Sequence, residues 1–283
     1  MYRTSPGTDV ARIAFAVRPN RPEADALADR AESWLAVRGH ESLRSIMTDR
    51  KIDLDGADLL VSLGGDGTLL RSVDSALATS VPVLGVNLGL LGYLTEVEPT
   101  GLEAALARFL DGQYEVEERM TLSVVVTAGD GTVLAEQWAL NEATVEKTVP
   151  GHTVRIAASI DGTPFVTYAA DGLLLATPTG STAYNLSARG PLLSPRLRAL
   201  VLTPVSPHML FDRPLVLDPD QRVRLEVLGP RPAVLVLDGL TVATLQPGAT
   251  VDCREGDLPA RLVTFGSRDF HAILRAKFHL ADR

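Results

Sequence analysis

The feature that most constrains the fold is a strand, a glycine-rich loop and a helix that follow one another directly in residues 57–78. Residues 59–63 form an apolar run with the length of a buried strand, and Gly-Gly-Asp-Gly follows at residues 64–67. A helix that begins after glycines leaves its first N–H groups unpaired, and the missing side chains let an anion approach them. The sequence therefore predicts a phosphate-binding loop, to which Arg71, one turn into the helix, would add a positive charge.

The carboxylate of Asp66 does not fit a simple phosphate cradle, because it repels a phosphate. Three roles would explain it: holding a metal ion, accepting a hydrogen bond from a ribose hydroxyl, or removing a proton from a hydroxyl that attacks phosphorus. A structural alternative is a turn residue or helix N-cap, since Asp-Gly is common in turns. The loop is not a Walker A loop, because no Gly-Lys-Ser/Thr follows, and it also lacks the Gly-x-Gly-x-x-Gly fingerprint.

The first part of the chain alternates between apolar runs and helical patterns. Strands are expected at residues 12–18, 59–63 and 81–87, and helices at residues 23–38, 68–78 and 101–112. Such alternation predicts a parallel sheet covered by helices. Ligands of these sheets bind at the carboxyl ends of the strands, which is where the glycine loop falls.

From about residue 116 the pattern changes to a period of two, which is typical of half-buried antiparallel strands. Asp-Gly pairs at residues 130–131, 161–162 and 238–239 lie between such runs and predict β-hairpins. We therefore expect an α/β domain of residues 1–115 and a mainly β domain of residues 116–261. The tail, residues 262–283, has helical spacing of its apolar residues and is expected to return to the first domain.

The composition excludes several classes of protein. The net charge is −8 and no basic run occurs, so we expect no nucleic-acid-binding face. No apolar run approaches the roughly 18–20 residues of a membrane span, and residues 13–17 are too short for a signal-peptide core. The single cysteine, Cys253, rules out internal disulfides and cysteine-based metal clusters. These features predict a soluble cytoplasmic protein without a membrane partner.

Two polar segments in the β domain are candidate binding sites. Asn141 and Glu142 follow an apolar strand, and an amide beside a carboxylate can bind neighbouring sugar hydroxyls, although a surface turn would look the same. Residues 169–191 bring many hydroxyl side chains together around Gly180, which favours contacts with sugar and phosphate over an ordinary polar loop. Asp171 could accept a hydrogen bond from an exocyclic amine or carboxamide. Residues 182–188 are expected to be helical, with N-terminal amides available to an anion.

The order of these segments resembles that of the NAD kinases, most closely the bacterial branch. The matching pieces are Gly-Gly-Asp-Gly-Thr at residues 64–68, GVNLGLLGYLTEV at 85–97, LNEATVEK at 140–147 and ADGLLLATPTGSTAYNLSA at 170–188. The glycine loop alone also occurs in diacylglycerol kinases and phosphofructokinases, whereas TPTGSTAY combined with Asn-Glu is specific. The resemblance implies the two-domain fold shared by NAD kinases and diacylglycerol kinases.

The resemblance further implies ATP-dependent phosphorylation of the 2′-hydroxyl of the adenosine ribose of NAD, giving NADP. Asp66 would be the general base, the α/β domain would bind nucleotide, and the β domain would bind NAD. Family members use a divalent cation, usually Mg²⁺, and assemble as homodimers or homotetramers. The sequence leaves open whether polyphosphate can replace ATP as the donor. The residues expected to bind substrates are Gly65, Asp66, Gly67, Arg71, Asn141, Glu142, Asp171, Thr182, Ala183, Tyr184 and Ser187.

Two positions depart from the family pattern. Arg189 stands where glycine is common, so it could supply charge for ATP or block a close backbone contact, and Leu240 replaces a frequent polar residue. Two other functions are therefore considered. A lipid kinase of the diacylglycerol or sphingosine type would share the glycine loop, but the negative charge and the hydroxyl cluster argue against it. A non-catalytic NAD(P) sensor would keep the pocket without the reaction.

Overall fold

The computed structural model describes residues 10–47, 51–89, 92–266 and 269–280. The chain divides into two compact units: Met1–Glu118 together with Ala260–Arg283, and Arg119–Pro259. Each unit has its own hydrophobic core. Among the described residues, no helix is long and apolar enough to cross a membrane.

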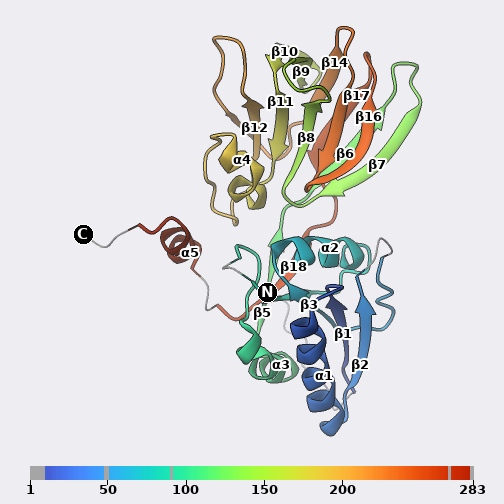
Figure 1. The fold of residues 1–283 in the computed structure, drawn as a ribbon, viewed down its shortest axis with the longest axis vertical. Coiled ribbons are helices and arrows are strands. Elements are labelled where there is room, and N and C mark those ends of the chain that lie inside the picture. The colour runs from blue at the N-terminus through green and yellow to red at the C-terminus, as the bar shows by residue number, and fades with distance from the viewer. Residues whose placement is uncertain (1–9, 48–50, 90–91, 267–268, 281–283) are drawn as a thin grey trace. The chain divides into compact units, whose positions relative to one another are not determined.

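The first unit is built on a six-stranded sheet with the order β2-β1-β3-β4-β18-β5. Its strands are β1 (Arg12–Val17), β2 (Glu41–Ile46), β3 (Leu59–Gly64), β4 (Val83–Asn87), β5 (Glu115–Arg119) and β18 (Ala260–Thr264). The pairs β1–β2, β1–β3, β3–β4 and β4–β18 are all parallel. Figure 1 shows that β18, from the end of the chain, lies beside β5. The sequence did not predict β2, because this edge strand is polar and none of its residues is buried.

Helices cover the strands of this sheet. Helices α1 (Pro22–Val37) and α3 (Leu102–Leu110) share one apolar cluster with alternate residues of β1, β3 and β4. Helix α2 (Asp66–Ala76) packs on β3, β4 and β18, with Leu69 and Val73 buried. A 3₁₀ turn, η1 (Pro99–Gly101), precedes α3, and α5 (Phe270–Lys277) ends the described chain with Ile273 buried and Phe278 exposed.

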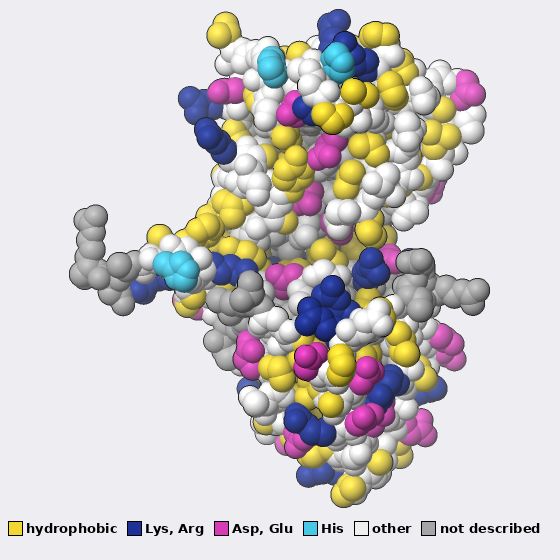
Figure 2. Space-filling model, viewed as in Figure 1, with side chains coloured by type: hydrophobic (Ala, Val, Ile, Leu, Met, Phe, Trp, Pro, Cys, Tyr) yellow, Lys and Arg dark blue, Asp and Glu magenta, His cyan; other side chains and the backbone are white. Residues whose placement is uncertain are grey.

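Charges of both signs are mixed on one face of the first unit. On the face that Figure 2 shows, Lys and Arg side chains are interspersed with Asp and Glu side chains over this unit. Arg44 of β2, for example, pairs with Glu32 at 2.7 Å and with Asp29 at 2.5 Å, both on α1. This face therefore carries no large region of a single charge.

The second unit consists of two six-stranded sheets in which every strand pair is antiparallel. One sheet has the order β10 (Thr163–Ala170), β9 (Val154–Ile160), β14 (Val223–Leu228), β17 (Thr250–Glu255), β6 (Leu122–Thr127), β7 (Val133–Ala139). The other has the order β13 (Leu215–Leu217), β12 (Leu200–Val205), β11 (Gly172–Ala176), β8 (Glu142–Lys147), β15 (Ala233–Leu237), β16 (Leu240–Leu245). Alternate residues of both sheets form one core, as the period of two requires.

The three predicted hairpins are all present, between β6 and β7, β9 and β10, and β15 and β16. In two of them both turn residues have positive φ: 51° and 77° at Asp161-Gly162, and 48° and 81° at Asp238-Gly239. This is the backbone geometry that favours Asp-Gly in two-residue hairpins. The α/β unit with parallel strands and the mainly β unit confirm the predicted fold class.

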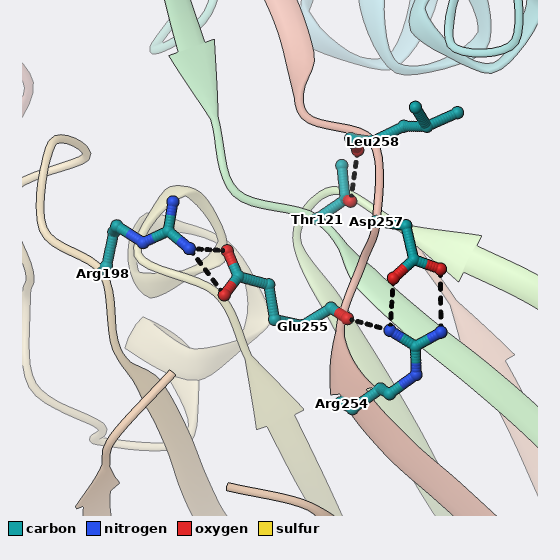
Figure 3. Close-up of polar contacts among 6 residues, drawn as sticks. All are labelled: Thr121, Arg198, Arg254, Glu255, Asp257 and Leu258. Atoms are coloured by element: carbon teal, nitrogen blue, oxygen red, sulfur yellow. Dashed lines mark hydrogen bonds and ion pairs between the residues drawn. The ribbon is translucent and has the colours of Figure 1, made fainter. Parts of the chain in front are cut away.

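Hydrogen bonds and ion pairs connect the first and last segments of the second unit, which are the residues before β6 and those at and after the end of β17 (Figure 3). Arg198 binds both carboxylate oxygens of Glu255 at 2.6 and 2.7 Å, and Arg254 binds both oxygens of Asp257 at 2.7 and 2.8 Å. The hydroxyl of Thr121 donates to the carbonyl of Leu258 at 2.8 Å. The end of β17 is therefore tied to the residues that precede β6.

Candidate functional site

The glycine loop joins β3 directly to α2. Gly64 is the last residue of β3, Gly65 is the N-cap of α2, and Asp66 is the first helical residue, two residues before the predicted start. The structure therefore does not support the N-cap alternative for Asp66. The Asp66 carboxylate instead accepts hydrogen bonds from the backbone N–H groups of Tyr93, at 2.8 Å, and Leu94, at 3.0 Å. A carboxylate has about four acceptor positions, so acceptor capacity remains for a ligand.

The glycines of the loop differ in what surrounds them. A Cβ added to Gly64 would lie 2.1 Å from Oγ1 of Thr68, so only glycine fits there. A Cβ added to Gly65 or Gly67 would meet no atom within 4 Å. Packing thus explains Gly64, whereas the open space at Gly65 and Gly67 is what the approach of a ligand to the backbone requires.

The turn that follows β4 lies against Asp66. A Cβ added to Gly92 would come 2.4 Å from Oδ1 of Asp66, so a larger residue at this position would displace the Asp66 carboxylate. The Tyr93 ring packs against Lys277 of α5, with Nζ 4.2 Å from the ring centroid, and burial and the charge of Asp66 raise the pKa of Tyr93. Leu90 and Leu91 of the same segment lie outside the described residues. Arg71 is exposed on α2 and makes no ion pair among the described residues.

Glu142 is a buried carboxyl group of the second unit. Its side chain begins β8, is 6% exposed, and its Oε2 atom has no hydrogen-bond partner among the described residues. Burial raises the pKa of Glu142 to about 8, the charges of Asp238 and Glu146 act in the same direction, and a hydrogen bond from the Tyr184 backbone opposes them. Glu142 is therefore largely a neutral acid at pH 7. Asn141, directly before it, is half-buried.

Asp171 lies at the other end of β8, and the Tyr184 side chain reaches Glu146 near that end. Lys147, the last residue of β8, donates to Oδ1 of Asp171 at 2.6 Å. Burial raises the pKa of Tyr184 to about 12, and a hydrogen bond with the Glu146 side chain adds to the shift. The sequence did not indicate a role for Lys147 or Glu146. The signal was available, because Glu142, Thr144 and Glu146 occupy alternate positions of β8 and so share one face.

The hydroxyl-rich segment covers the outer face of the sheet that contains β11. It is less helical than predicted: a 3₁₀ turn η2 (Thr179–Thr182) and the short helix α4 (Tyr184–Ser187) are separated at Ala183. The buried Asn185 side chain donates to the carbonyl of Pro191 at 3.0 Å and accepts from the Thr203 hydroxyl at 2.7 Å. This asparagine fixes the segment and was not recognised in the sequence.

The four residues expected to line an adenosine site remain accessible on this segment. Tyr184 and Ser187 are exposed, and Thr182 and Ala183 are half-buried. Thr177, Thr179 and Ser181, in contrast, are buried and hydrogen-bonded within the unit. The buried hydroxyl side chains of this segment therefore stabilise the fold, and the accessible residues are free to contact a ligand.

The two departures from the expected pattern have different structural settings. Arg189 directly follows the C-cap of α4 with φ of +64°, the left-handed conformation in which glycine is strongly favoured. Leu240 is 53% exposed at the start of β16. The backbone conformation thus favours glycine at residue 189, where this chain has Arg. The backbone at Leu240 has no positive φ and does not favour glycine.

The fold and these groups define a class of protein. A glycine loop at the carboxyl end of a parallel strand, with a carboxylate at the first residue of the next helix, is suited to phosphoryl transfer. A second unit that exposes hydroxyls beside a buried acid is suited to binding a sugar or nucleoside. Together they describe a two-domain kinase with a nucleotide substrate.

Comparison with known proteins identifies the family. The model of the ATP-NAD kinase N-terminal domain matches residues 45–114, and that of the C-terminal domain matches residues 140–265. NAD kinase 2 of Streptomyces coelicolor is 47% identical over 80% of this chain and 75% of its own length. The NAD kinase of Heliobacterium modesticaldum is 41% identical over 94% of this chain and 97% of its own length. The chain belongs to the NAD kinase family.

Solved structures agree on the fold. The crystal structure of yeast NADH kinase complexed with NADH has a TM-score of 0.86 at 24% identity and covers 97% of this chain and 90% of its own. An NAD kinase from Archaeoglobus fulgidus in complex with ATP has a TM-score of 0.74 at 26% identity, with coverage of 96% and 100%. The comparisons do not support the lipid kinase or sensor alternatives.

Proposed function

We propose that Asp66 is the general base with which this protein, as an NAD kinase, phosphorylates NAD. The enzyme transfers a phosphoryl group from ATP to an alcohol group of NAD. The proposed acceptor is the 2′-hydroxyl of the adenosine ribose, and the product is NADP. The observation that carries the assignment of Asp66 is its position at the start of α2, beside Gly65 and Gly67 with their open approach.

The proposed chemistry balances in a single displacement. The ribose hydroxyl oxygen forms a bond to the γ-phosphorus, the bond between this phosphorus and the β–γ bridging oxygen breaks, and ADP leaves. The proton of the hydroxyl goes to the Asp66 carboxylate. The open backbone at Gly65 and Gly67 and the exposed Arg71 would stabilise negative charge on the phosphates.

In this proposal the second unit binds NAD, and the glycine loop of the first unit binds the phosphates. Asn141 and Glu142 would bind ribose hydroxyls, since one is half-buried and the other has an unpartnered buried oxygen. Thr182, Ala183, Tyr184 and Ser187 would line the adenosine site, which their accessibility supports. Asp171 would meet the adenine or nicotinamide end, with Lys147 fixing its orientation.

Mg²⁺ is the proposed cofactor, and ATP would bring it. No group of three acidic, histidine or cysteine side chains within the described ranges could hold a metal ion. Mg²⁺ in kinases is bound mainly by substrate phosphates, waters and one or two carboxylates, so such a cluster is not required, and Asp66 has the acceptor capacity to contribute. The ion would neutralise charge on the transferring phosphoryl group.

A coupled assay of NADP formation tests the proposed function. The purified protein should form NADP from NAD and ATP with Mg²⁺, and EDTA should abolish the reaction. Polyphosphate, run in parallel, tests the alternative donor. Absence of NADP formation at any Mg²⁺ concentration, with NAD still bound, would overturn the proposal. We also propose a cytoplasmic homodimer or homotetramer, which light scattering tests.

A further inference from the structure

One carboxylate binds three successive backbone N–H groups at the start of β8. Oδ2 of Asp238 accepts from the Leu140 amide at 2.7 Å, and Oδ1 accepts from the amides of Asn141 and Glu142 at 2.7 and 3.1 Å. The backbone N–H of Asp238 returns a hydrogen bond to the carbonyl of Glu142 at 3.1 Å. Residues 140–142 have three backbone N–H groups and three backbone carbonyl groups. Asp238 forms hydrogen bonds with all three N–H groups and with one of the carbonyls.

Thr177 holds the remaining two groups. Its hydroxyl donates to the carbonyl of Leu140 at 2.6 Å, and its backbone N–H donates to the carbonyl of Asn141 at 2.9 Å. The same hydroxyl accepts from the Gly180 amide at 3.1 Å, and a Cβ on Gly180 would lie 2.0 Å from the Asn141 carbonyl oxygen. Two residues that are distant in the sequence thus fix the whole backbone of residues 140–142.

The hairpin alone does not explain a carboxylate at residue 238. A turn with positive φ at both central residues also accepts Asn or Gly at its first position. The Asp238 charge also has a cost, because it lies near a second buried acid and is one cause of the raised pKa of Glu142. A residue that served only the turn would avoid this repulsion.

We propose that Asp238 and Thr177 are positioning residues for NAD, which fix the directions of the Asn141 and Glu142 side chains. This inference rests on the proposed function, in which those two side chains bind ribose hydroxyls. With its backbone held on both sides, the Asn141-Glu142 pair presents a preformed arrangement of donors and acceptors, so NAD binding requires little ordering.

The proposal also assigns a charge state to Glu142. The groups that act on its carboxyl are Asp238 from the β15–β16 hairpin, Glu146 from its own strand, and the Tyr184 backbone from α4. Both acidic neighbours favour the neutral form of Glu142. A neutral acid can donate a hydrogen bond from one oxygen to a ribose hydroxyl oxygen, which a carboxylate cannot do.

Asp238→Asn is the primary test. Asparagine keeps the size of the side chain, but its amide nitrogen would face a backbone N–H, so the hold on Leu140 or Asn141 is lost. We expect the KM for NAD to rise at least tenfold while the KM for ATP stays within twofold. The ionisation of Glu142, followed by ¹³C NMR of its side-chain carboxyl and assigned with Glu142→Gln, should move to lower pH. A folded variant with an unchanged KM for NAD and unchanged Glu142 ionisation would overturn the proposal.

Two variants of Thr177 provide a second test, which applies even if Asp238→Asn does not fold. Thr177→Ser retains the hydroxyl that binds Leu140 and Gly180, whereas Thr177→Val keeps the shape without it. We expect Thr177→Val to raise the KM for NAD severalfold and Thr177→Ser to stay near wild type. Equal kinetics for the two variants would contradict a positioning role for the hydroxyl.

Asn141→Ala separates failure of this inference from failure of the proposed function. If Asn141→Ala leaves the KM for NAD unchanged, the assignment of Asn141 to ribose is wrong, and the positioning proposal falls with it. If Asn141→Ala raises this KM but neither Asp238→Asn nor Thr177→Val does, the ribose assignment stands and the positioning proposal alone is wrong.

Discussion

At the scale of single residues, the carboxyl groups of Asp66 and Glu142 differ in their hydrogen bonds and in their burial. Asp66 accepts two backbone hydrogen bonds and keeps acceptor positions for a proton or a ligand. Glu142 is buried beside other acids, which favours the neutral form. The sequence pointed to both residues as polar groups near a strand end, but burial and neighbouring charges, which it does not display, separate their roles.

The protonation of Glu142 predicts a specific dependence of stability on pH. Because the pKa is raised from an ordinary 4.5 to about 8, the folded state holds the proton more tightly than the unfolded state. The resulting stabilisation is fully present below about 4.5 and is lost as the pH rises through about 8. We expect Glu142→Gln to exceed wild type in stability at pH 9 by a few kcal/mol, and to match it near pH 4.5.

Urea unfolding across this pH range measures the difference. Glu136→Gln, on the exposed side of edge strand β7, is the control and should track wild type throughout. If Glu142→Gln and wild type lose stability in parallel between pH 5 and pH 9, Glu142 is not neutral in the folded protein.

Arg189 supplies a prediction about the backbone. A non-glycine residue in the left-handed conformation costs about 1 kcal/mol, so Arg189→Gly should raise the free energy of unfolding by up to about that amount. Arg189→Ala removes the same charge but keeps the unfavourable conformation, so it should give no gain. Denaturant unfolding compares them, and equal stability of the two variants would refute the backbone explanation. A higher KM for ATP in both variants would show that the charge serves the donor.

At the scale of elements, the junction between β3 and α2 combines packing with access to a ligand. Gly64 is required by contact with Thr68, whereas Gly65 and Gly67 face open space. The sequence predicted the strand, the loop and the helix, because the apolar run and the helical stripe are strong local signals. It could not assign separate reasons to the glycines, since these depend on which atoms lie nearby in three dimensions.

Alanine at Gly64 and Gly67 tests this division. Gly64→Ala should destabilise the protein by about 1–3 kcal/mol through overpacking, visible as a lower melting temperature. Gly67→Ala should leave the melting temperature unchanged and raise the KM for ATP or NAD at least fivefold, because its Cβ would occupy space that a ligand needs. Wild-type kinetics for a folded Gly67→Ala variant would show that no ligand approaches this backbone.

Elements with strong local patterns were predicted well, and others were not. The Asp-Gly hairpins and the period of two were sufficient for the β unit, whereas polar edge strand β2 has no apolar pattern to detect. The sequence predicts a helix at residues 182–188, but the chain breaks at Ala183 and α4 begins only at Tyr184. Buried side-chain contacts, such as Asn185 with Thr203, shape this segment, and local propensity does not report them.

At the scale of the whole molecule, the chain leaves the first unit after β5 and returns with β18 to complete its sheet. The order of motifs along the sequence was sufficient to recognise the family, which the comparisons then established. The pairing of β18 with β4 joins Leu262 to Val83, on either side of the whole second unit, so no local pattern could predict it.

The central claim is that the Asp66 carboxylate removes the proton from the attacking hydroxyl. Single-turnover formation of NADP by wild type and Asp66→Asn, at saturating NAD and ATP, tests it most directly. Asparagine retains one oxygen for the Tyr93 or Leu94 amide, and calorimetric titration with NAD checks that the substrate still binds. We predict a rate about 10²- to 10⁴-fold lower, with the Kd for NAD within a few-fold of wild type. A variant that binds NAD and turns it over at near the wild-type rate would contradict the general-base assignment.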